Sequence, residues 1–240
     1  MLLAAGLGTR LRPLTDHTPK ALIDVGGVPI LERVARRLID AGADRLVINL
    51  HHLGEQIRRY VEAHEGFGVE VLFSPEPERA LETGGGLLRA APLLRRDAPF
   101  FLHNADIVSD LPLASMYGAH QRDAPLATLA VMERPATRRL LFDDLGLVGR
   151  VDEGKGLRVE AREPVGEVRS LAFAGVHVLS PEILDRITER GAFSILDPYL
   201  RLAGEGARLL PFRVDGCRWS DIGKPEQLAE ARRWMERPLP

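Results

Sequence analysis

The chain has 240 residues, of which 45% are hydrophobic and 28% are charged, and its formal net charge at pH 7 is -2. This length allows one α/β domain with a full core, and the charge balance lacks the basic excess typical of nucleic-acid-binding proteins. No apolar run approaches the roughly 18 to 20 residues that span a bilayer, and the one cysteine, Cys217, excludes an intramolecular disulfide. We therefore expect a cytoplasmic monomer or homodimer that binds neither nucleic acid nor a membrane.

Short runs rich in aliphatic and aromatic residues recur along the chain and predict strands. In chain order they are residues 1–5, 45–50, 69–73, 100–103, 126–132, 171–179 and 209–214. The first run barely reaches the usual strand length of about 5 to 6 residues, which suggests that the natural chain begins a few residues earlier.

Apolar residues at helical spacing predict amphipathic helices between the early strands. The three stripes cover residues 31–41, 57–64 and 87–94. Later, Ser-Pro-Glu at 180–182 predicts the start of a helix that ends at Gly191, and Lys-Pro-Glu at 224–226 predicts the start of the last helix. The alternation of strand and helix predicts an α/β fold with a mostly parallel central sheet flanked by helices.

The segment 139–170 has a different pattern, because paired acids and frequent glycines separate short apolar pieces. This pattern predicts a small insertion of antiparallel hairpins beside the main sheet. Since no repeat or linker interrupts the chain, we expect residues 1–240 to form one domain.

The first strand is followed by Gly6-Leu7-Gly8-Thr9-Arg10, a loop in which glycine amides can approach an anion closely. Arg10, Arg12 and Lys20 are cations near this loop, and the proline at position 19 holds the chain before Lys20 extended. The two common phosphate motifs are absent, since no Gly-Lys-Ser/Thr element occurs and Leu11 occupies the third glycine position of Gly-x-Gly-x-x-Gly. The loop predicts a polyphosphate site, with a plain structural turn as the alternative.

Two acids follow predicted strands and are candidate Mg²⁺ ligands. Asp106 comes directly after the strand at 100–103, and Asp221 lies between Trp219 and Gly223. Ligands of open parallel sheets sit at the carboxyl ends of strands, and Mg²⁺ takes one or two carboxylates with phosphate oxygens and water. The alternative for Asp106 is a turn or cap acid, and Asp110 is better interpreted as a helix cap.

Three consecutive glycines, Gly84 to Gly86, open the helix predicted near residue 87. They predict a surface where a nucleobase or its ribose can approach the backbone, with a flexible connection as the alternative. His51 and His52 lack a third ligand at metal spacing and are interpreted as surface or structural residues. The serines lack the context of a nucleophile elbow, so a serine hydrolase is not expected.

These elements, in this order, resemble the motifs of the sugar-1-phosphate nucleotidylyltransferases over nearly the whole chain. They are the loop at 6–10, Thr-Pro-Lys at 18–20, Glu-Thr-Gly-Gly at 82–85, Asn-Ala-Asp at 104–106 and Trp-Ser-Asp-Ile-Gly at 219–223. The resemblance implies a Rossmann-like nucleotidyltransferase fold and transfer of a nucleoside monophosphate from an NTP to a sugar 1-phosphate, with release of pyrophosphate. It also implies Mg²⁺ as cofactor and no strong general base, because the attacking phosphate is already anionic.

The resemblance leads to the following expected site. We expect Arg10, Lys20 and Asp106 to be catalytic; Ala4, Ala5, Gly6, Gly8, Thr9, Arg10, Lys20, Glu76, Thr83, Gly84 and Asn104 to bind the nucleotide; Glu82, Asn104, Arg162, Arg169 and Gly175 to bind the sugar phosphate; and Asp106 and Asp221 to bind Mg²⁺.

Within the family, the short length and the segments Ser-Pro-Glu at 74–76 and Leu-Glu-Thr-Gly-Gly-Gly at 81–86 are similar to bacterial N-acetylmuramate 1-phosphate uridylyltransferases of cell-wall recycling. UTP is therefore the favoured nucleotide. The Glu-Lys-Pro element with which many relatives grip the sugar phosphate is absent, and Arg162 or Arg169 are its candidate substitutes.

Several alternatives stay open from the sequence. GTP with mannose or heptose 1-phosphate, and CTP with phosphocholine, are alternative substrate pairs. A non-catalytic module that senses nucleotide sugars is the alternative from another class, and the presence of the lysine and both aspartates argues against it. A dinucleotide-dependent dehydrogenase is disfavoured by the missing third glycine.

Overall fold

The computed structural model describes residues 1–76 and 78–236. Its strands are β1 (Leu2–Leu3), β2 (Arg45–Leu50), β3 (Glu70–Pro75), β4 (Phe100–Asn104), β5 (Ile107–Ser109), β6 (Ala127–Met132), β7 (Arg138–Asp143), β8 (Gly146–Asp152), β9 (Leu157–Glu160), β10 (Arg169–Leu179), β11 (Leu209–Arg213) and β12 (Trp219–Asp221). Its α-helices are α1 (Ile30–Asp40), α2 (Gly54–Ala63), α3 (Glu82–Ala90), α4 (Leu113–Asp123), α5 (Ile183–Arg186), α6 (Leu196–Gly204) and α7 (Pro225–Glu236). Short 3-10 helices occupy Thr9–Leu11, Lys20–Leu22, Glu65–Gly68, Ala91–Leu93 and Glu153–Lys155.

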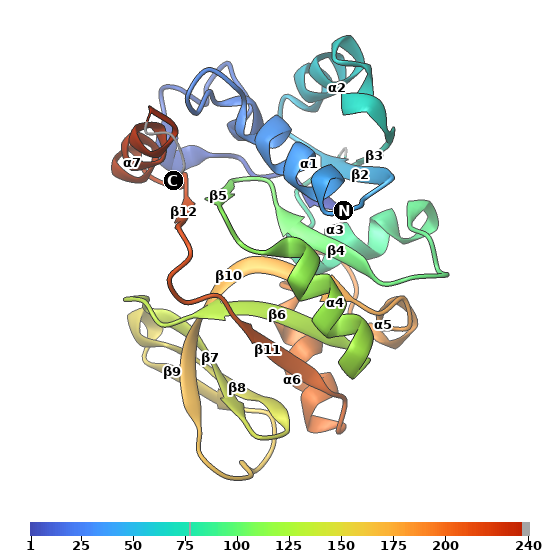
Figure 1. Ribbon diagram of the computed structural model, residues 1–240, viewed down its shortest axis with the longest axis vertical. Helices are drawn as coiled ribbons and strands as arrows, with labels where there is room; N and C mark the ends of the chain where they lie inside the picture. Colours follow the sequence, from blue (N-terminus) through green and yellow to red (C-terminus); the bar gives the residue numbers. More distant parts are fainter. Residues whose placement is uncertain (77, 237–240) are drawn as a thin grey trace.

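One mixed sheet runs through the molecule in the order β3-β2-β1-β4-β10-β7-β8-β9, with β6 paired to β10 and β11 paired to β6 (Figure 1). The strands β3, β2, β1 and β4 are parallel, as are β6 and β11. Because β10 is antiparallel to both β4 and β6, these two strands point the same way. The ends of β1, β4 and β6 therefore lie at one edge of the sheet, the edge where open α/β sheets bind ligands.

Two apolar clusters hold the helices on the two faces of the sheet. The first contains Leu31, Val34 and Leu38 of α1 with residues of α2, α4 and α7, and the second contains Leu87 of α3 and Tyr199 of α6 with residues of α5. The buried faces repeat at three and four residues, which is the spacing that a helix presents to a sheet. No helix in residues 1–76 and 78–236 is both long and apolar enough to cross a membrane.

The predicted α/β fold with parallel core strands and flanking helices is confirmed, and six predicted strands agree with β2, β3, β4, β6, β10 and β11 to within about two residues. The helix predicted from Ser180 to Gly191 is wrong in length, because only Ile183–Arg186 is helical. The Ser180 hydroxyl donates to the Pro125 carbonyl instead of capping the helix (2.7 Å). The sequence analysis also missed α4 and α6.

The antiparallel hairpins expected over 139–170 are formed by β7, β8 and β9. At the turn between β7 and β8 the Asp143 carboxylate accepts hydrogen bonds from the amides of Leu145 (2.9 Å) and Gly146 (3.1 Å), so the acid and glycine of this segment make the turn.

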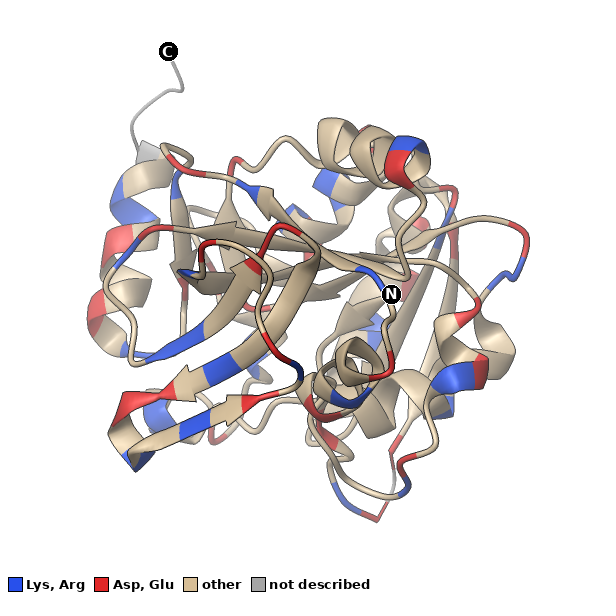
Figure 2. Ribbon diagram, turned by 90° about the horizontal axis from the view of Figure 1, so that it is seen from below, with Lys and Arg blue, Asp and Glu red and all other residues tan. Residues whose placement is uncertain are grey.

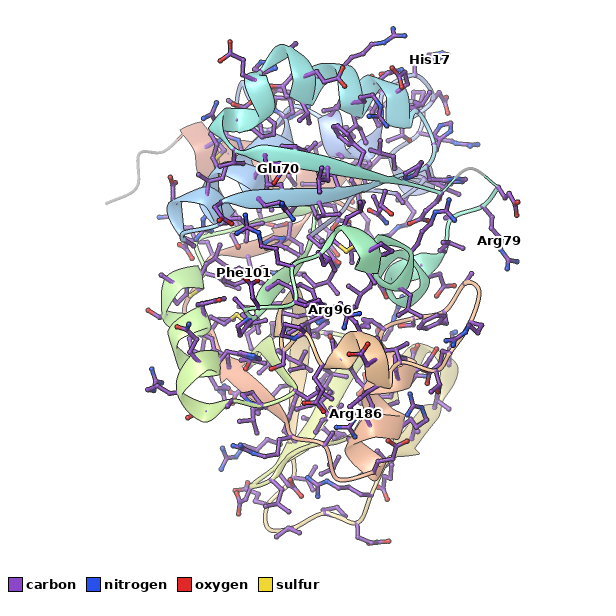
Figure 3. The ribbon with its side chains drawn as sticks, turned by 90° about the vertical axis from the view of Figure 1, so that its right-hand side faces the viewer. His17, Glu70, Arg79, Arg96, Phe101 and Arg186 are labelled. Carbon is purple, nitrogen blue, oxygen red and sulfur yellow. The ribbon has the colours of Figure 1, made fainter. Side chains whose placement is uncertain are left out.

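Acidic and basic residues are mixed along the chain rather than gathered by sign (Figure 2). Figure 3 shows Arg96, in the segment before β4, below the β3 edge that carries Glu70. Arg96 pairs with Asp185 of α5 (2.8 Å).

Candidate active site

A cavity of about 520 Å³ opens where β1 and β4 end. Eleven of the expected site residues line it, together with Leu3, Leu7, Ala21, Asn49, Ala80, Ala105, Ser194 and Gly223. The eleven are Ala4, Ala5, Gly6, Gly8, Thr9, Arg10, Lys20, Glu82, Thr83, Asn104 and Asp106. Sequence segments from Leu3 to Gly223 thus converge on one space, at the edge of the sheet that the topology favours.

The first loop is held open by local contacts at its second glycine. Gly8 has φ 64°, in the left-handed region, and a side chain there would lie 2.7 Å from the methyl group of Thr15. The Thr15 hydroxyl donates to the Gly8 carbonyl (2.8 Å), which fixes the turn. By contrast, no atom beyond its chain neighbours lies within 4 Å of the position that a Gly6 side chain would occupy. Gly8 is therefore required by the fold, whereas Gly6 leaves room beside the cavity.

The Lys20 ammonium and the Asp106 carboxylate form an ion pair on the cavity wall. Only 11% of the Lys20 side chain is exposed, against 32% of Asp106. The lysine is held by the 3-10 helix Lys20–Leu22, whose turn begins after Pro19. The pair places a positive charge and a carboxylate side by side, which suits binding of a phosphate with its metal ion.

Asp221 lies next to Asp106 because β12 pairs with β5. Asp221 is opposite Ile107 in this small sheet, and the Ile222 amide donates to the Asp106 carbonyl (2.9 Å). Asp221 itself does not line the cavity, but Gly223 does, and the Gly223 amide donates to the Asp221 carboxylate (3.4 Å). The expected two acids are thus brought to one place.

The donor set fits Mg²⁺ better than a transition metal. In the described part of the chain, no group of three or more His, Cys, Asp or Glu side chains is arranged to hold a metal ion. Mg²⁺ is bound in many enzymes by one or two carboxylates with substrate phosphates and water. Asp106 and Asp221 supply such a pair beside a cavity lined by glycine and cationic residues.

Asn49 is a site residue that the sequence analysis missed. Its carbonyl oxygen accepts the Ala4 amide (2.6 Å), and its amide group donates to Glu76 (2.7 Å). Glu76 also accepts the Leu81 amide (2.7 Å). The sequence does contain an indication of this role. Asn49 is the one polar residue in the otherwise apolar run from Leu46 to Leu50, and a buried polar side chain needs a hydrogen-bond partner.

Glu76, which was expected to contact the nucleotide, is 2% exposed and does not line the cavity. Through Asn49 and Leu81 it connects the first loop to the start of α3, and its carbonyl is contacted by His51 Nδ1 (2.6 Å). The structure therefore places Glu76 behind the site, as a residue that positions others. This contact also accounts for His51, which was interpreted as structural.

The glycines of α3 meet the chain's own atoms rather than an open surface. A side chain at Gly84 would lie 2.2 Å from the Phe193 ring, and one at Gly85 would lie 2.2 Å from the Gly191 carbonyl oxygen. The Gly84 amide already donates to the Phe193 carbonyl (2.9 Å). The expectation of an open backbone for a nucleobase at this helix start is therefore corrected: the glycines allow close packing of α3 on residues 191–193, and Gly84 does not line the cavity.

Glu82 and Thr83, at the first turn of α3, do line the cavity. Glu82 has φ 58°, which is unusual for a residue with a side chain, and it lies at the position where such strain often marks function. The Thr83 hydroxyl accepts the Ile195 amide (2.9 Å), so Thr83 also fixes the segment before α6.

Three of the five expected sugar-phosphate residues do not line the cavity. Arg162 makes a two-pronged ion pair with Asp143, whose side chain is fully buried (2.5 and 2.7 Å). These hydrogen bonds lower the pKa of Asp143. Arg169 lies at the start of β10, beside Phe142 of β7. Gly175 has φ 72° and packs against Asn104, where a side chain would lie 2.8 Å from the amide nitrogen.

Comparisons with known proteins show which family and fold the chain has. A family model described as nucleotidyl transferase matches residues 1–237. The chain is 34% identical over 238 residues to the N-acetylmuramate alpha-1-phosphate uridylyltransferase of Caulobacter vibrioides, covering 97% of this chain and 95% of the relative. It is 35% identical over 242 residues to the enzyme of the same description from Neisseria meningitidis, covering 97% and 96%. A solved UDP-glucose pyrophosphorylase from Acinetobacter baumannii superimposes with a TM-score of 0.80 at 19% identity, covering 99% of this chain and 93% of that one.

Proposed function

The chain belongs to the nucleotidyl transferase family and is a sugar-1-phosphate nucleotidyltransferase, and we propose that it transfers UMP from UTP to N-acetylmuramate 1-phosphate. The product is the UDP-sugar, and pyrophosphate leaves. The observation that carries the proposal is the convergence of the first loop, Lys20 and Asp106 on one cavity. Identity of 34–35% to two uridylyltransferases over nearly their whole length supports the choice of base and sugar.

The reaction needs alignment and charge neutralisation more than proton transfer. An oxygen of the sugar phosphate attacks the α-phosphorus of UTP, a new oxygen–phosphorus bond forms, and the bond to the bridging oxygen of the β-phosphate breaks. Because the attacking oxygen is already anionic, no strong base is required. The amides of the first loop and the cations Arg10 and Lys20 are placed to hold the triphosphate and to stabilise the charge that develops on pyrophosphate.

Asp106 and Asp221 are the residues that would hold Mg²⁺, which supplies charge neutralisation at phosphate oxygens when bound. Lys20 Nζ contacts Asp106, so its positive charge lies beside a carboxylate that would hold the metal ion. Arg10 lies next to Gly223, because a side chain at position 223 would come 2.7 Å from the Arg10 guanidinium. Gly223 therefore leaves space for Arg10 to reach the ligand.

The test is pyrophosphate release with Mg²⁺ in a grid of four NTPs against the 1-phosphates of N-acetylmuramate, mannose, glucose and heptose, with phosphocholine added. We expect the strongest turnover with UTP and N-acetylmuramate 1-phosphate. Strong turnover with another pair would overturn the substrates while keeping the reaction. Nucleotide binding by folded protein without any turnover would favour the non-catalytic sensing module. A role in cell-wall recycling and a cytoplasmic location are proposals that follow from the first outcome.

A further inference from the structure

Arg134 is a cation that the sequence analysis did not single out. It lies two residues beyond β6, at the same edge of the sheet as the ends of β1 and β4. Its guanidinium carbon is 3.9 Å from the centre of the Trp219 ring, which is a stacked cation–π contact. Since Trp219 and Asp221 are two residues apart on β12, their side chains lie on one face of the strand.

A bulge in β10 anchors both stacked residues. The pairing of β10 with β6 shifts between Phe173 and His177, which leaves carbonyl groups out of the ladder. The Phe173 carbonyl accepts a hydrogen bond from Arg134 Nη2 (3.3 Å), and the Ala174 carbonyl accepts one from the Trp219 indole (2.8 Å). The next residue, Gly175, packs on Asn104, which lines the cavity. Arg134 does not itself line the cavity, but the bulge that holds it continues into Gly175, which packs on a cavity residue.

These contacts do not give every N–H group of the Arg134 guanidinium a hydrogen-bond partner. Its Nε atom is buried without a hydrogen-bond partner among the described residues, and its other contacts are to backbone carbonyls. The neighbouring Glu133 pairs with Arg213 instead (2.8 Å). Burial lowers the pKa of Arg134, and the negative charge of Asp221 raises it by a smaller amount. The guanidinium and that carboxylate therefore interact electrostatically. A half-buried arginine that is held by stacking and hydrogen bonds near Asp221 suits a phosphate dianion.

We propose that Arg134, stacked on Trp219, binds the phosphate group of the sugar 1-phosphate acceptor. This inference rests on the proposed function and deepens it, because it names the residue that would hold the phosphate of the acceptor. Arg162 does not fill this role, because its guanidinium is committed to the buried Asp143 carboxylate. The planar guanidinium offers several N–H donors to phosphate oxygens while Trp219 limits its motion.

The experiment compares wild type with Arg134→Met and Arg134→Lys, using the NTP and sugar 1-phosphate that give the strongest turnover in the grid. Methionine keeps a flexible side chain over Trp219 without the charge. We expect Arg134→Met to raise the KM of the acceptor by about 10- to 100-fold, with the KM of the NTP unchanged. In the reverse reaction the KM of pyrophosphate should also stay unchanged. Arg134→Lys should recover part of the acceptor affinity.

Arg213→Ala is the matched control, because it loosens the same segment through Glu133 without removing the Arg134 guanidinium. Its acceptor KM should equal that of wild type. If Arg134 only supports β12, Arg134→Met should instead lower kcat and weaken nucleotide binding while leaving the acceptor KM unchanged, and that result overturns the proposal. An equal rise of the acceptor KM in Arg213→Ala overturns it as well.

Failure of the proposed function gives a different result. If no acceptor in the grid turns over, binding of glucose 1-phosphate and of inorganic phosphate to the UTP-loaded protein is measured by titration calorimetry. Weaker binding to Arg134→Met than to wild type supports the phosphate site even then. Equal binding, or none by either protein, overturns it.

Discussion

The proposed nucleotide side of the cavity and the proposed acceptor side next to it hold their charged groups by different contacts. On the nucleotide side, Gly8, Thr15 and Lys20 belong to one continuous stretch of sequence, and their contacts are mostly local. On the acceptor side, Arg134, Phe173 and Trp219 meet only because β6, β10 and β12 fold together.

This difference explains why the first side can be recognised from a sequence motif, whereas the second side cannot. A loop that must place backbone amides needs glycines at fixed spacing, and that spacing is visible in one sequence. An arginine that reaches a site across a sheet can come from many positions, because its side chain is long and flexible. Short-range patterns therefore predict phosphate recognition on the nucleotide side, and tertiary structure decides which cation serves the acceptor.

The largest effect is expected at Asp106, where the two sides meet. Asp106→Asn should lower kcat by at least about 10³-fold, because it removes a carboxylate that would hold Mg²⁺ while keeping an oxygen for Lys20. Steady-state kinetics over a range of Mg²⁺ concentrations measure this loss, and the melting temperature should stay close to that of wild type. Asp110→Asn is the control, since Asp110 accepts the Arg218 amide outside the cavity (2.8 Å). Near-normal turnover of Asp106→Asn would contradict the assigned site.

A smaller effect, on stability rather than catalysis, is expected at Arg162. Arg162→Met leaves the buried Asp143 with three amide donors but without its ion pair. We expect the free energy of unfolding at pH 7 to fall by about 2 to 3 kcal/mol, as measured by urea denaturation, with the acceptor KM unchanged. A raised acceptor KM in a protein of normal stability would mean that Arg162 contacts the acceptor, and Arg134 would then not be the distinguishing cation of that side.

The sequence predicted most of the sheet because buried strands and amphipathic helices have periodicities that one chain displays. The first loop with Lys20, and the acid after the strand at 100–103, likewise predicted residues that share the cavity, whereas Asp221 lies just behind its wall. The contacts of Glu76 and Gly84 with other segments could not be predicted. A sequence motif alone does not show whether its residues contact a ligand or other residues of the protein. The packing of Glu76 and Gly84 against Asn49 and Phe193 depends on segments more than 25 residues away.

The short α5 shows the same limit at the level of local structure. Ser180 has the residue type and the following proline of a helix N-cap. In the fold its hydroxyl lies between the Pro125 carbonyl and the buried His120 (2.7 and 3.1 Å), so tertiary contacts take the group that would have capped the helix. Ile187, just after α5, is buried in the second apolar cluster, which favours an early end to the helix.

The smallest effect concerns β10, the strand that joins the two sides. His177 is 1% exposed, its Nδ1 contacts the Tyr199 hydroxyl (2.8 Å), and burial lowers its pKa to about 3. The folded protein therefore keeps this imidazole neutral, whereas the unfolded chain takes up a proton below pH of about 6.5. The contribution of His177 to stability is complete above that pH and is lost as the pH falls toward the folded pKa.

We expect the free energy of unfolding of wild type to decrease by about 1 to 2 kcal/mol between pH 7.5 and pH 5 from this residue alone. In His177→Gln, which does not titrate but can still contact Tyr199, urea denaturation at the two pH values should show a correspondingly smaller decrease. His52→Gln, at an exposed position, should behave as wild type. An unchanged pH dependence in His177→Gln would mean that the imidazole is protonated in the folded protein. The junction at β10 would then open to water more readily than its packing indicates, and the two sides of the cavity would be less rigidly joined.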